Sequence, residues 1–145
     1  MQNSKPTPTP TILGLKLSKE GCSNNSNPTL YKSMIGNLMY LATTRTNILY
    51  AVNLVLRFMD TPKETHWQAA KRILRDVNGT KHYGILYTTT SDFRLVGYTN
   101  SDWAGSVDDR KSRSRYAFRL GSGAISWASK KQPIMSLSIA KLNTS

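Results

Sequence analysis

The first half of the chain places its hydrophobic residues at helical spacing. Between residues 27 and 81, apolar side chains recur every three to four positions, which predicts amphipathic helices. The first of them begins at Asn27 and Pro28, a pair typical of a helix N-terminus. A second segment, residues 48–59, is apolar on nearly every face, so we expect it to be the most buried helix. The apolar face of the first predicted helix comprises Leu30, Met34, Ile35, Leu38, Met39 and Ala42.

A third helix is predicted from Thr61 onwards. The sequence Thr61-Pro62-Lys63-Glu64 has the form of a capping box, with a hydroxyl at the cap, proline next and glutamate three residues after the cap. Gly79 is expected to end this helix. Its predicted inward face consists of Trp67, Ala70, Leu74 and Val77.

From residue 82 the period of the pattern changes to two, which is typical of β-strands. In residues 115–120, we expect Tyr116, Phe118 and Leu120 to face inward and Arg115 and Arg119 to face solvent. Short turns between such segments predict an antiparallel meander, and the fold class is therefore α+β. The predicted strands are residues 82–87, 93–98, 115–120 and 124–128.

Residues 1–26 show neither period. They contain alternating prolines and threonines at 6–10 and a serine/asparagine cluster at 23–26, a composition typical of a flexible linker. The chain is thus predicted to consist of a linker (1–26), a helical part (27–81) and a β-rich part (82–145).

The charge of the chain narrows its possible partners. Twenty Lys and Arg residues face eight Asp and Glu residues, which gives a net charge of +12 over 145 residues. This excess indicates a polyanionic partner, most simply nucleic acid, or else a surface that only increases solubility. No segment approaches the roughly 18 apolar residues of a membrane span, and the single cysteine, Cys22, cannot form an internal disulfide. We therefore expect an intracellular protein without a membrane partner.

Basic residues of the predicted sheet are the candidates for contacts with phosphate, with a merely solvated face as the alternative. They are Arg113, Arg115, Arg119, Lys130 and Lys131. The three tryptophans, Trp67, Trp103 and Trp127, are expected to be core residues rather than base-stacking platforms. His66 and His82 have no partner at a metal-ligand spacing, so neither is assigned a role.

Several segments resemble the Pol polyproteins of copia-type retrotransposons. Residues 31–41 (YKSMIGNLMYL) and 66–75 (HWQAAKRILR) are similar to the end of the reverse transcriptase. Residues 97–105, 108–112 and 125–132 resemble the ribonuclease H domain that follows it. The resemblance implies a thumb-like helical segment followed by an incomplete ribonuclease H-like antiparallel β-meander.

The resemblance also implies an activity and the residues that it needs. The family's ribonuclease H domain cuts the RNA strand of an RNA–DNA hybrid with two divalent cations, usually Mg²⁺, which several carboxylates must hold about 3.5–4 Å apart. Here Asn100 stands at one family carboxylate position and Asn143 at another, and the remaining family acids are expected beyond Ser145. Asp102 is left as a weak candidate, because one carboxylate cannot hold two cations. We therefore expect no intact catalytic site, no bound metal or other cofactor and no small-molecule substrate.

Other departures from the family pattern indicate relaxed constraint on packing. The sequence Arg113-Ser114-Arg115-Tyr116 stands where the family tends to have Thr-Ser-Gly-Tyr. Asp76 replaces a family tyrosine near a helix end, where a negative charge opposes the helix dipole. Both changes are typical of a decaying copy.

Three functions stay open at this point. The first is a truncated, catalytically inactive remnant of a copia-type polyprotein that retains weak affinity for RNA–DNA hybrid or another nucleic acid. The second is a non-enzymatic basic module that binds nucleic acid. The third is a metal-dependent ribonuclease that acts on RNA–DNA hybrids, through Asp102 or by completion in trans.

Overall fold

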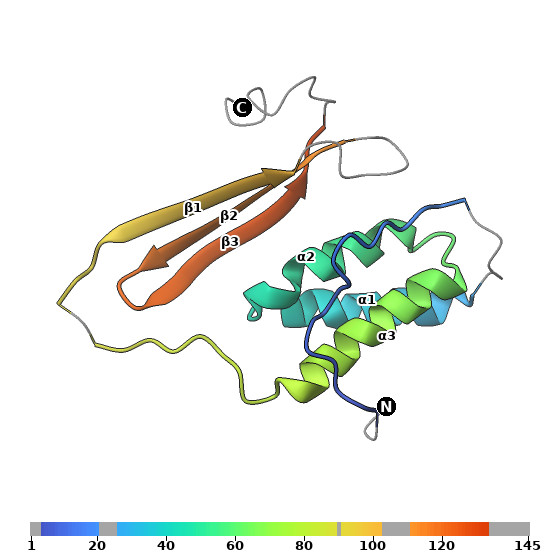
Figure 1. Ribbon diagram of the computed structural model, residues 1–145, viewed down its shortest axis with the longest axis horizontal. Coiled ribbons are helices and arrows are strands. Elements are labelled where there is room, and N and C mark those ends of the chain that lie inside the picture. Colours follow the sequence, from blue (N-terminus) through green and yellow to red (C-terminus); the bar gives the residue numbers. More distant parts are fainter. Residues whose placement is uncertain (1–3, 21–25, 90, 103–110, 134–145) are drawn as a thin grey trace. The chain divides into compact units, whose positions relative to one another are not determined.

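The chain folds into a helical unit and a sheet unit. A computed structural model describes residues 4–20, 26–89, 91–102 and 111–133 (Figure 1). The helical unit is Met1–Gly84 and the sheet unit is Ile85–Ser145. Described helices and a three-stranded antiparallel sheet confirm the predicted α+β class. Among the described residues, no helix is both long enough and apolar enough to cross a bilayer.

Three α-helices and one short 3₁₀ helix form the helical unit. They are α1 (Pro28–Ala42), α2 (Thr46–Val55), η1 (Leu56–Phe58) and α3 (Glu64–Gly79). The predicted start of α1 is confirmed, because the Asn27 side chain accepts hydrogen bonds from the N–H groups of Thr29 (3.0 Å) and Leu30 (3.2 Å). The predicted end of α3 at Gly79 is also confirmed.

One hydrophobic core joins the three α-helices. Its buried members are Tyr31, Ile35, Leu38, Ala42, Ile48, Ala51, Val52, Val55, Ala70 and Ile73. Trp67, Leu74 and Val77 pack against this core, as predicted. Two residues assigned to the inward face of α1 are instead exposed, Leu30 (60%) and Met39 (46%). Tyr31 takes the place expected for Leu30, because its ring packs edge-on against Trp67 and its hydroxyl donates to the Val55 carbonyl at 2.8 Å.

The predicted capping box at Thr61 is wrong about where α3 begins. The helix starts at Glu64, and the Pro62 carbonyl, two residues earlier, accepts a hydrogen bond from the Ser26 N–H at 2.9 Å. Pro62 is buried and anchors the chain ahead of α1. His66 Nδ1 accepts the Lys63 N–H at 3.0 Å and so satisfies one free donor at the helix N-terminus.

Residues 4–20 run as irregular chain along α3 (Figure 1). The Arg72 guanidinium donates to the carbonyl and the hydroxyl of Thr9, at 3.1 and 3.0 Å. Pro6 lies so close to Gly79 that a Cβ at Gly79 would sit 2.8 Å from the proline Cβ. These contacts hold the segment against the helix; the linker role of residues 1–26 and its flexibility stay predictions.

The sheet unit is a meander of β1 (Leu95–Asp102), β2 (Arg113–Leu120) and β3 (Gly123–Lys131), in the order β1-β2-β3. Both strand pairs are antiparallel, as predicted. Gly121 has a positive φ of 55°, which suits the two-residue turn between β2 and β3. A β-bulge shifts the β2–β3 register between Phe118 and Arg119.

The strand predicted at residues 82–87 is absent from this described part of the chain. Hydrogen bonds that involve side chains attach residues 87 and 88 to the β2–β3 turn and the start of β3. The Tyr87 hydroxyl donates to the Ala124 carbonyl at 2.6 Å, and the Thr88 N–H donates to Ser122 Oγ at 2.9 Å. The Tyr87 ring also fills the space beside Gly123, 2.5 Å from where a Cβ would stand. The alternating pattern here reflects aromatic packing on the β2–β3 turn and not strand pairing.

Candidate nucleic-acid interface

Strand register sorts the sheet's side chains onto two faces, because directly paired residues of antiparallel strands point to the same side. Asn100 pairs with Arg115, and Arg115 in turn pairs with Ser129. We call this side the basic face. Its described residues are Val96, Tyr98, Asn100, Arg113, Arg115, Ala117, Arg119, Trp127, Ser129 and Lys131.

The other side of the sheet is the apolar face. Phe118 lies over Gly97, where an added Cβ would be 2.8 Å from the phenylalanine ring. Tyr116 and Phe118 pack together with ring centroids 5.5 Å apart. They and Leu120 were predicted to face inward, but each is 37–39% exposed, since the described strands alone do not bury them. The apolar face comprises Leu95, Gly97, Thr99, Ser101, Ser114, Tyr116, Phe118, Leu120, Ser126, Ala128 and Lys130.

The structure brings four of the five predicted phosphate-binding candidates onto the basic face. Lys130 pairs with Ser114 and belongs to the apolar face. Arg113 is only 5% exposed, so it is not a surface cation. Arg119 is exposed, and Arg115 and Lys131 are half-buried. The basic face thus carries one exposed arginine, Arg119, and two half-buried cations, Arg115 and Lys131, among the described residues.

Positions 100 and 102 of β1, where the family pattern places carboxylates, are each paired with an arginine of β2. Asn100 pairs with Arg115, and the backbone of Asp102 pairs with that of Arg113. Residues directly opposite each other have Cβ atoms about 4.5–5.5 Å apart. An arginine at the paired position carries a positive charge that repels a metal cation and attracts a phosphate.

Few acids offset this charge within the described residues. Asp92, just before β1, forms an ion pair with Arg94 at 2.9 Å. Hydrogen bonds from the Arg94 side chain and backbone, with a smaller effect from Arg119, hold the pKa of the Asp92 carboxyl below its ordinary value. The described residues contain no group of three or more His, Cys, Asp or Glu side chains that could hold a metal ion. Asn143, Trp103 and the Asp108-Asp109 pair lie outside the described residues.

Two aromatic residues complete the basic face. Tyr98 is 56% exposed, and Trp127 is half-buried. Sequence reasoning treated Trp127 as a core residue and gave Tyr98 no role. The period of two alone places Tyr98 on the side of Asn100, but only the register across three strands places Trp127 there as well.

The buried polar residues of the helical unit have structural roles. His66 is fully buried and stacked on Phe58, with ring centroids 3.9 Å apart. Because its Nδ1 accepts the Lys63 N–H, Nε2 carries the proton and donates to the Ser18 carbonyl at 3.0 Å. The histidine thereby ties the N-terminal segment to the start of α3. Its two partners are 3 and 48 residues away in sequence, so no motif could have revealed both.

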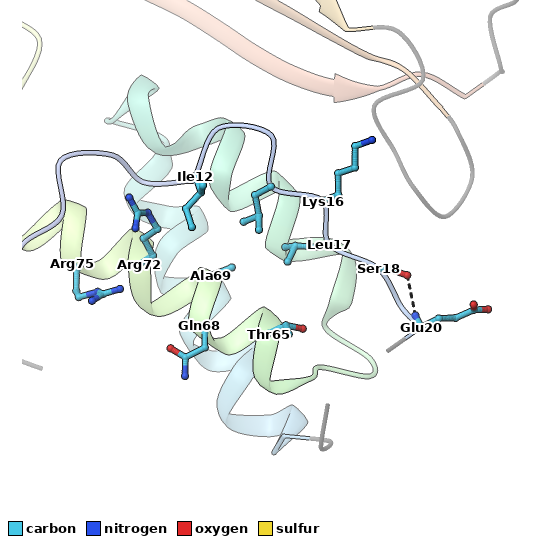
Figure 2. Close-up of a pocket in the computed structure, with 11 residues that line it drawn as sticks. Ile12, Lys16, Leu17, Ser18, Glu20, Thr65, Gln68, Ala69, Arg72 and Arg75 are labelled. Carbon is cyan, nitrogen blue, oxygen red and sulfur yellow. Dashed lines mark hydrogen bonds between the residues drawn. The ribbon is translucent and has the colours of Figure 1, made fainter. Parts of the chain in front are cut away.

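A pocket of about 670 Å³ lies between the N-terminal segment and α3. Figure 2 shows Ile12 and Leu17 of the segment on one side and Ala69 of α3 on the other. The Arg72 side chain that reaches this pocket is already bonded to Thr9. Most of the surface that lines this pocket is apolar, contributed by residues such as Ile12, Leu17 and Ala69.

Comparison with known proteins identifies relatives over most of the chain. It is 44% identical over 132 residues to the retrovirus-related Pol polyprotein from transposon RE1 of Arabidopsis thaliana, which covers 91% of this chain and 9% of that protein. It is 43% identical over 145 residues to the Pol polyprotein from transposon TNT 1-94 of Nicotiana tabacum, with coverages of 95% and 11%. Secreted RxLR effector protein 161 of Plasmopara viticola is 45% identical over 109 residues, with coverages of 74% and 77%. No family model and no solved structure matches.

Fold and site together define an α+β protein whose sheet carries one basic and one apolar face. The relatives show its origin: the chain belongs to the family of copia-type retrotransposon Pol polyproteins. It spans about a tenth of the length of the Pol polyproteins named above.

Proposed function

We propose that this chain is a catalytically inactive remnant of the reverse transcriptase and ribonuclease H region of a copia-type Pol polyprotein, and that it binds nucleic acid weakly through its basic face. In this proposal the sheet unit is the beginning of a ribonuclease H-like domain. The helical unit is the end of the reverse transcriptase. Both assignments rest on family membership and on the order of the helices and strands along the chain.

The pairing of Asn100 with Arg115 is the observation that supports inactivity most directly. An amide at this position brings no charge to a metal, and a guanidinium opposite it raises the free energy of any cation there. Metal ions supply several kcal/mol of transition-state stabilisation in such reactions. A loss of about 4 kcal/mol already corresponds to a roughly thousandfold lower rate.

A cleavage assay tests the absence of activity. The full chain is incubated with a labelled RNA–DNA hybrid and Mg²⁺ or Mn²⁺, and we expect no products above those in buffer. The Asp102→Asn variant serves as the matched control, because it removes the one carboxylate candidate of β1. Metal-dependent products that disappear in Asp102→Asn would show an active nuclease and would refute the proposal.

Metal binding can be followed without any activity. Mn²⁺ broadens the NMR signals of nearby amides, so a bound ion would selectively weaken those of Tyr98, Asn100 and Arg115. We expect uniform, weak broadening over the chain. Selective loss of these three signals at low Mn²⁺ would show that the basic face binds a metal ion and would contradict the proposed inactivity.

Salt dependence tests nucleic-acid binding. Affinity for an RNA–DNA hybrid should fall steeply with salt, because each phosphate contact releases condensed counterions. The double variant Arg115→Ser/Arg119→Ser should reduce the slope of log affinity against log salt by about 1 to 2, since each lost phosphate contact changes it by about 0.9. Lys130→Ser, which changes the apolar face, is the control and should leave the slope unaltered within about 0.3. Absence of binding to the hybrid and to single-stranded nucleic acid alike at low salt would refute this part of the proposal.

A further inference from the structure

The aromatic residues of the basic face share one row across the sheet. Tyr98 pairs with Ala117, and Ala117 pairs with Trp127. Neighbouring strands lie about 4.8 Å apart, so the two aromatic residues stand roughly 10 Å apart with only a methyl group between them. An exposed tyrosine and a half-buried tryptophan on either side of an alanine form a shallow aromatic surface.

Arginines lie on both sides of this aromatic row. Along β2, Arg115 precedes Ala117 by two residues and Arg119 follows it by two. Residues two apart on a strand point to the same side and are about 6.6–6.8 Å apart. Arg115 and Arg119 therefore lie on the two sides of the aromatic row, one toward each end of β2. Lys131 is a further cation on the same face.

The apolar face has aromatic residues in a different arrangement. Tyr116 and Phe118 contact each other, and Phe118 covers Gly97. The candidate cation on that face is Lys130. Aromatic rings and several arginines thus occur together only on the basic face within the described sheet.

This combination favours one class of ligand. Proteins that bind single-stranded nucleic acid stack bases on aromatic side chains and bind the phosphates with basic ones. In a duplex the bases are stacked on one another and cannot lie on a protein ring. We infer that the basic face binds single-stranded nucleic acid, with bases stacked on Tyr98 and Trp127 and phosphates held by Arg115, Arg119 and Lys131. This inference rests on the proposed nucleic-acid binding and adds the form of the ligand.

Fluorescence anisotropy of the full chain tests the inference. The probes are labelled 20-nucleotide oligo(dT), oligo(U) and an RNA–DNA hybrid of equal length, each measured at several salt concentrations. We expect tighter binding of one or both single strands than of the hybrid, by about tenfold. The two single-stranded probes identify which sugar the face accepts, and tight binding of either supports the inference.

Two variants test the stacking itself. Tyr98→Ala and Trp127→Ala should each weaken single-strand binding by about fivefold to a hundredfold, the range for loss of one base–aromatic contact. Hybrid binding should change by less than about twofold, because its bases do not reach the rings. Trp127→Phe keeps a ring and should retain most of the affinity, and circular dichroism confirms that each variant is folded.

The opposite face supplies matched controls. Tyr116→Ala and Phe118→Ala remove aromatic rings from β2, the strand between those of Tyr98 and Trp127, and single-strand affinity should be unchanged within about twofold. Equal losses in these controls, or unaltered single-strand binding by both Tyr98→Ala and a folded Trp127→Ala, would overturn the inference. If hybrid and single strands bind equally well and neither ring matters, the stacking inference fails while the proposed nucleic-acid binding stands. If none of the three probes binds at low salt, both fail.

Discussion

The two units use the same kinds of side chain in opposite ways. In the helical unit Tyr31 is fully buried and donates its hydroxyl to a backbone carbonyl 24 residues away. In the sheet unit Tyr98 is 56% exposed and stands between two arginine rows. Tyr31 therefore stabilises the first unit from inside its core, whereas Tyr98 lies largely on the surface of the second.

The difference arises from what each architecture can bury. Three amphipathic α-helices enclose a common core, so His66 and Asp76 are buried together with the apolar residues. A three-stranded sheet has two faces and encloses neither of them by itself. Side chains of the described strands stay partly exposed even where they are large, as Phe118 and Leu95 show. The functional surface of this chain is therefore expected on the sheet.

The largest predicted effect concerns the helical core. Ile35→Ala removes a fully buried side chain and should lower the free energy of unfolding by about 2–5 kcal/mol. Leu95→Ala removes a side chain that is 63% exposed and should change stability of the sheet by no more than about 0.5 kcal/mol. Amide hydrogen exchange measures both, because it reports the helices and strands separately. Similar losses from the two substitutions would show that the units do not differ in burial as described.

The next effect concerns buried hydrogen bonds of a histidine. His66→Ala leaves the Lys63 N–H and the Ser18 carbonyl without their partner and removes a ring stacked on Phe58. We expect a loss of about 2–3 kcal/mol in urea denaturation. His82→Ala is the matched control, since His82 is exposed and its loss should be within about 0.5 kcal/mol. Faster proteolysis of residues 4–20 should accompany the loss in His66→Ala; unchanged cleavage there would argue against the histidine as their anchor.

A smaller loss is expected when only one hydroxyl is removed. Tyr31→Phe keeps the ring against Trp67 but deletes the 2.8 Å hydrogen bond to the Val55 carbonyl. This should cost about 1 kcal/mol, the typical net value of a neutral hydrogen bond. Burial raises the pKa of the Tyr31 hydroxyl far above its ordinary value, so it is un-ionised throughout the neutral range. Tyr40→Phe, at a position 82% exposed, should have no measurable effect; a loss equal to that of Tyr31→Phe would contradict the buried bond.

Sequence patterns predicted those features that depend on neighbours along the chain. Asn27 and Pro28 gave the start of α1, and the alternation in residues 115–120 gave β2 and its two sides. Predictions failed where distant residues decide the structure. Residues 82–87 alternate like a strand, but Tyr87 packs on Gly123 and bonds to Ala124, far along the chain. The start of α3 was misplaced because the Pro62 carbonyl bonds to Ser26.

The candidate site likewise combines features set by neighbouring residues in the sequence with features set by distant ones. Alternation alone places Arg115 and Arg119 on one side of β2. It cannot tell which β1 residue faces Arg115, because the connection between β1 and β2 is too long to fix a register. The bulge near Phe118 likewise shifts β3 by one residue and decides that Trp127 pairs with Ala117. The basic face and its aromatic row are therefore properties of the pairing and become visible only in the fold.

The last predicted effect is a gain in stability when the charge of a buried acid is removed. Asp76 is 2% exposed, and among the described residues its Oδ2 has no hydrogen-bond partner. Burial raises the pKa of its carboxyl, and the charges of Arg45 and Arg72 only partly oppose this. The folded chain therefore holds this proton more tightly than the unfolded chain. Stability declines as pH rises from the ordinary aspartate pKa through the raised one, and the full cost is reached above the raised pKa.

Asp76→Asn removes that charge and keeps the shape of the side chain. We expect a gain on the order of 1 kcal/mol at pH 7 and a smaller difference in acid, where the wild-type carboxyl is protonated. Urea denaturation at several pH values measures both. Asp60→Asn is the control, because the Asp60 side chain is 96% exposed, lies 3.5 Å from Lys32 and should contribute little. A loss of stability in Asp76→Asn at neutral pH would show that the attraction of Arg45 and Arg72 outweighs burial, and that this buried acid stabilises the helical unit.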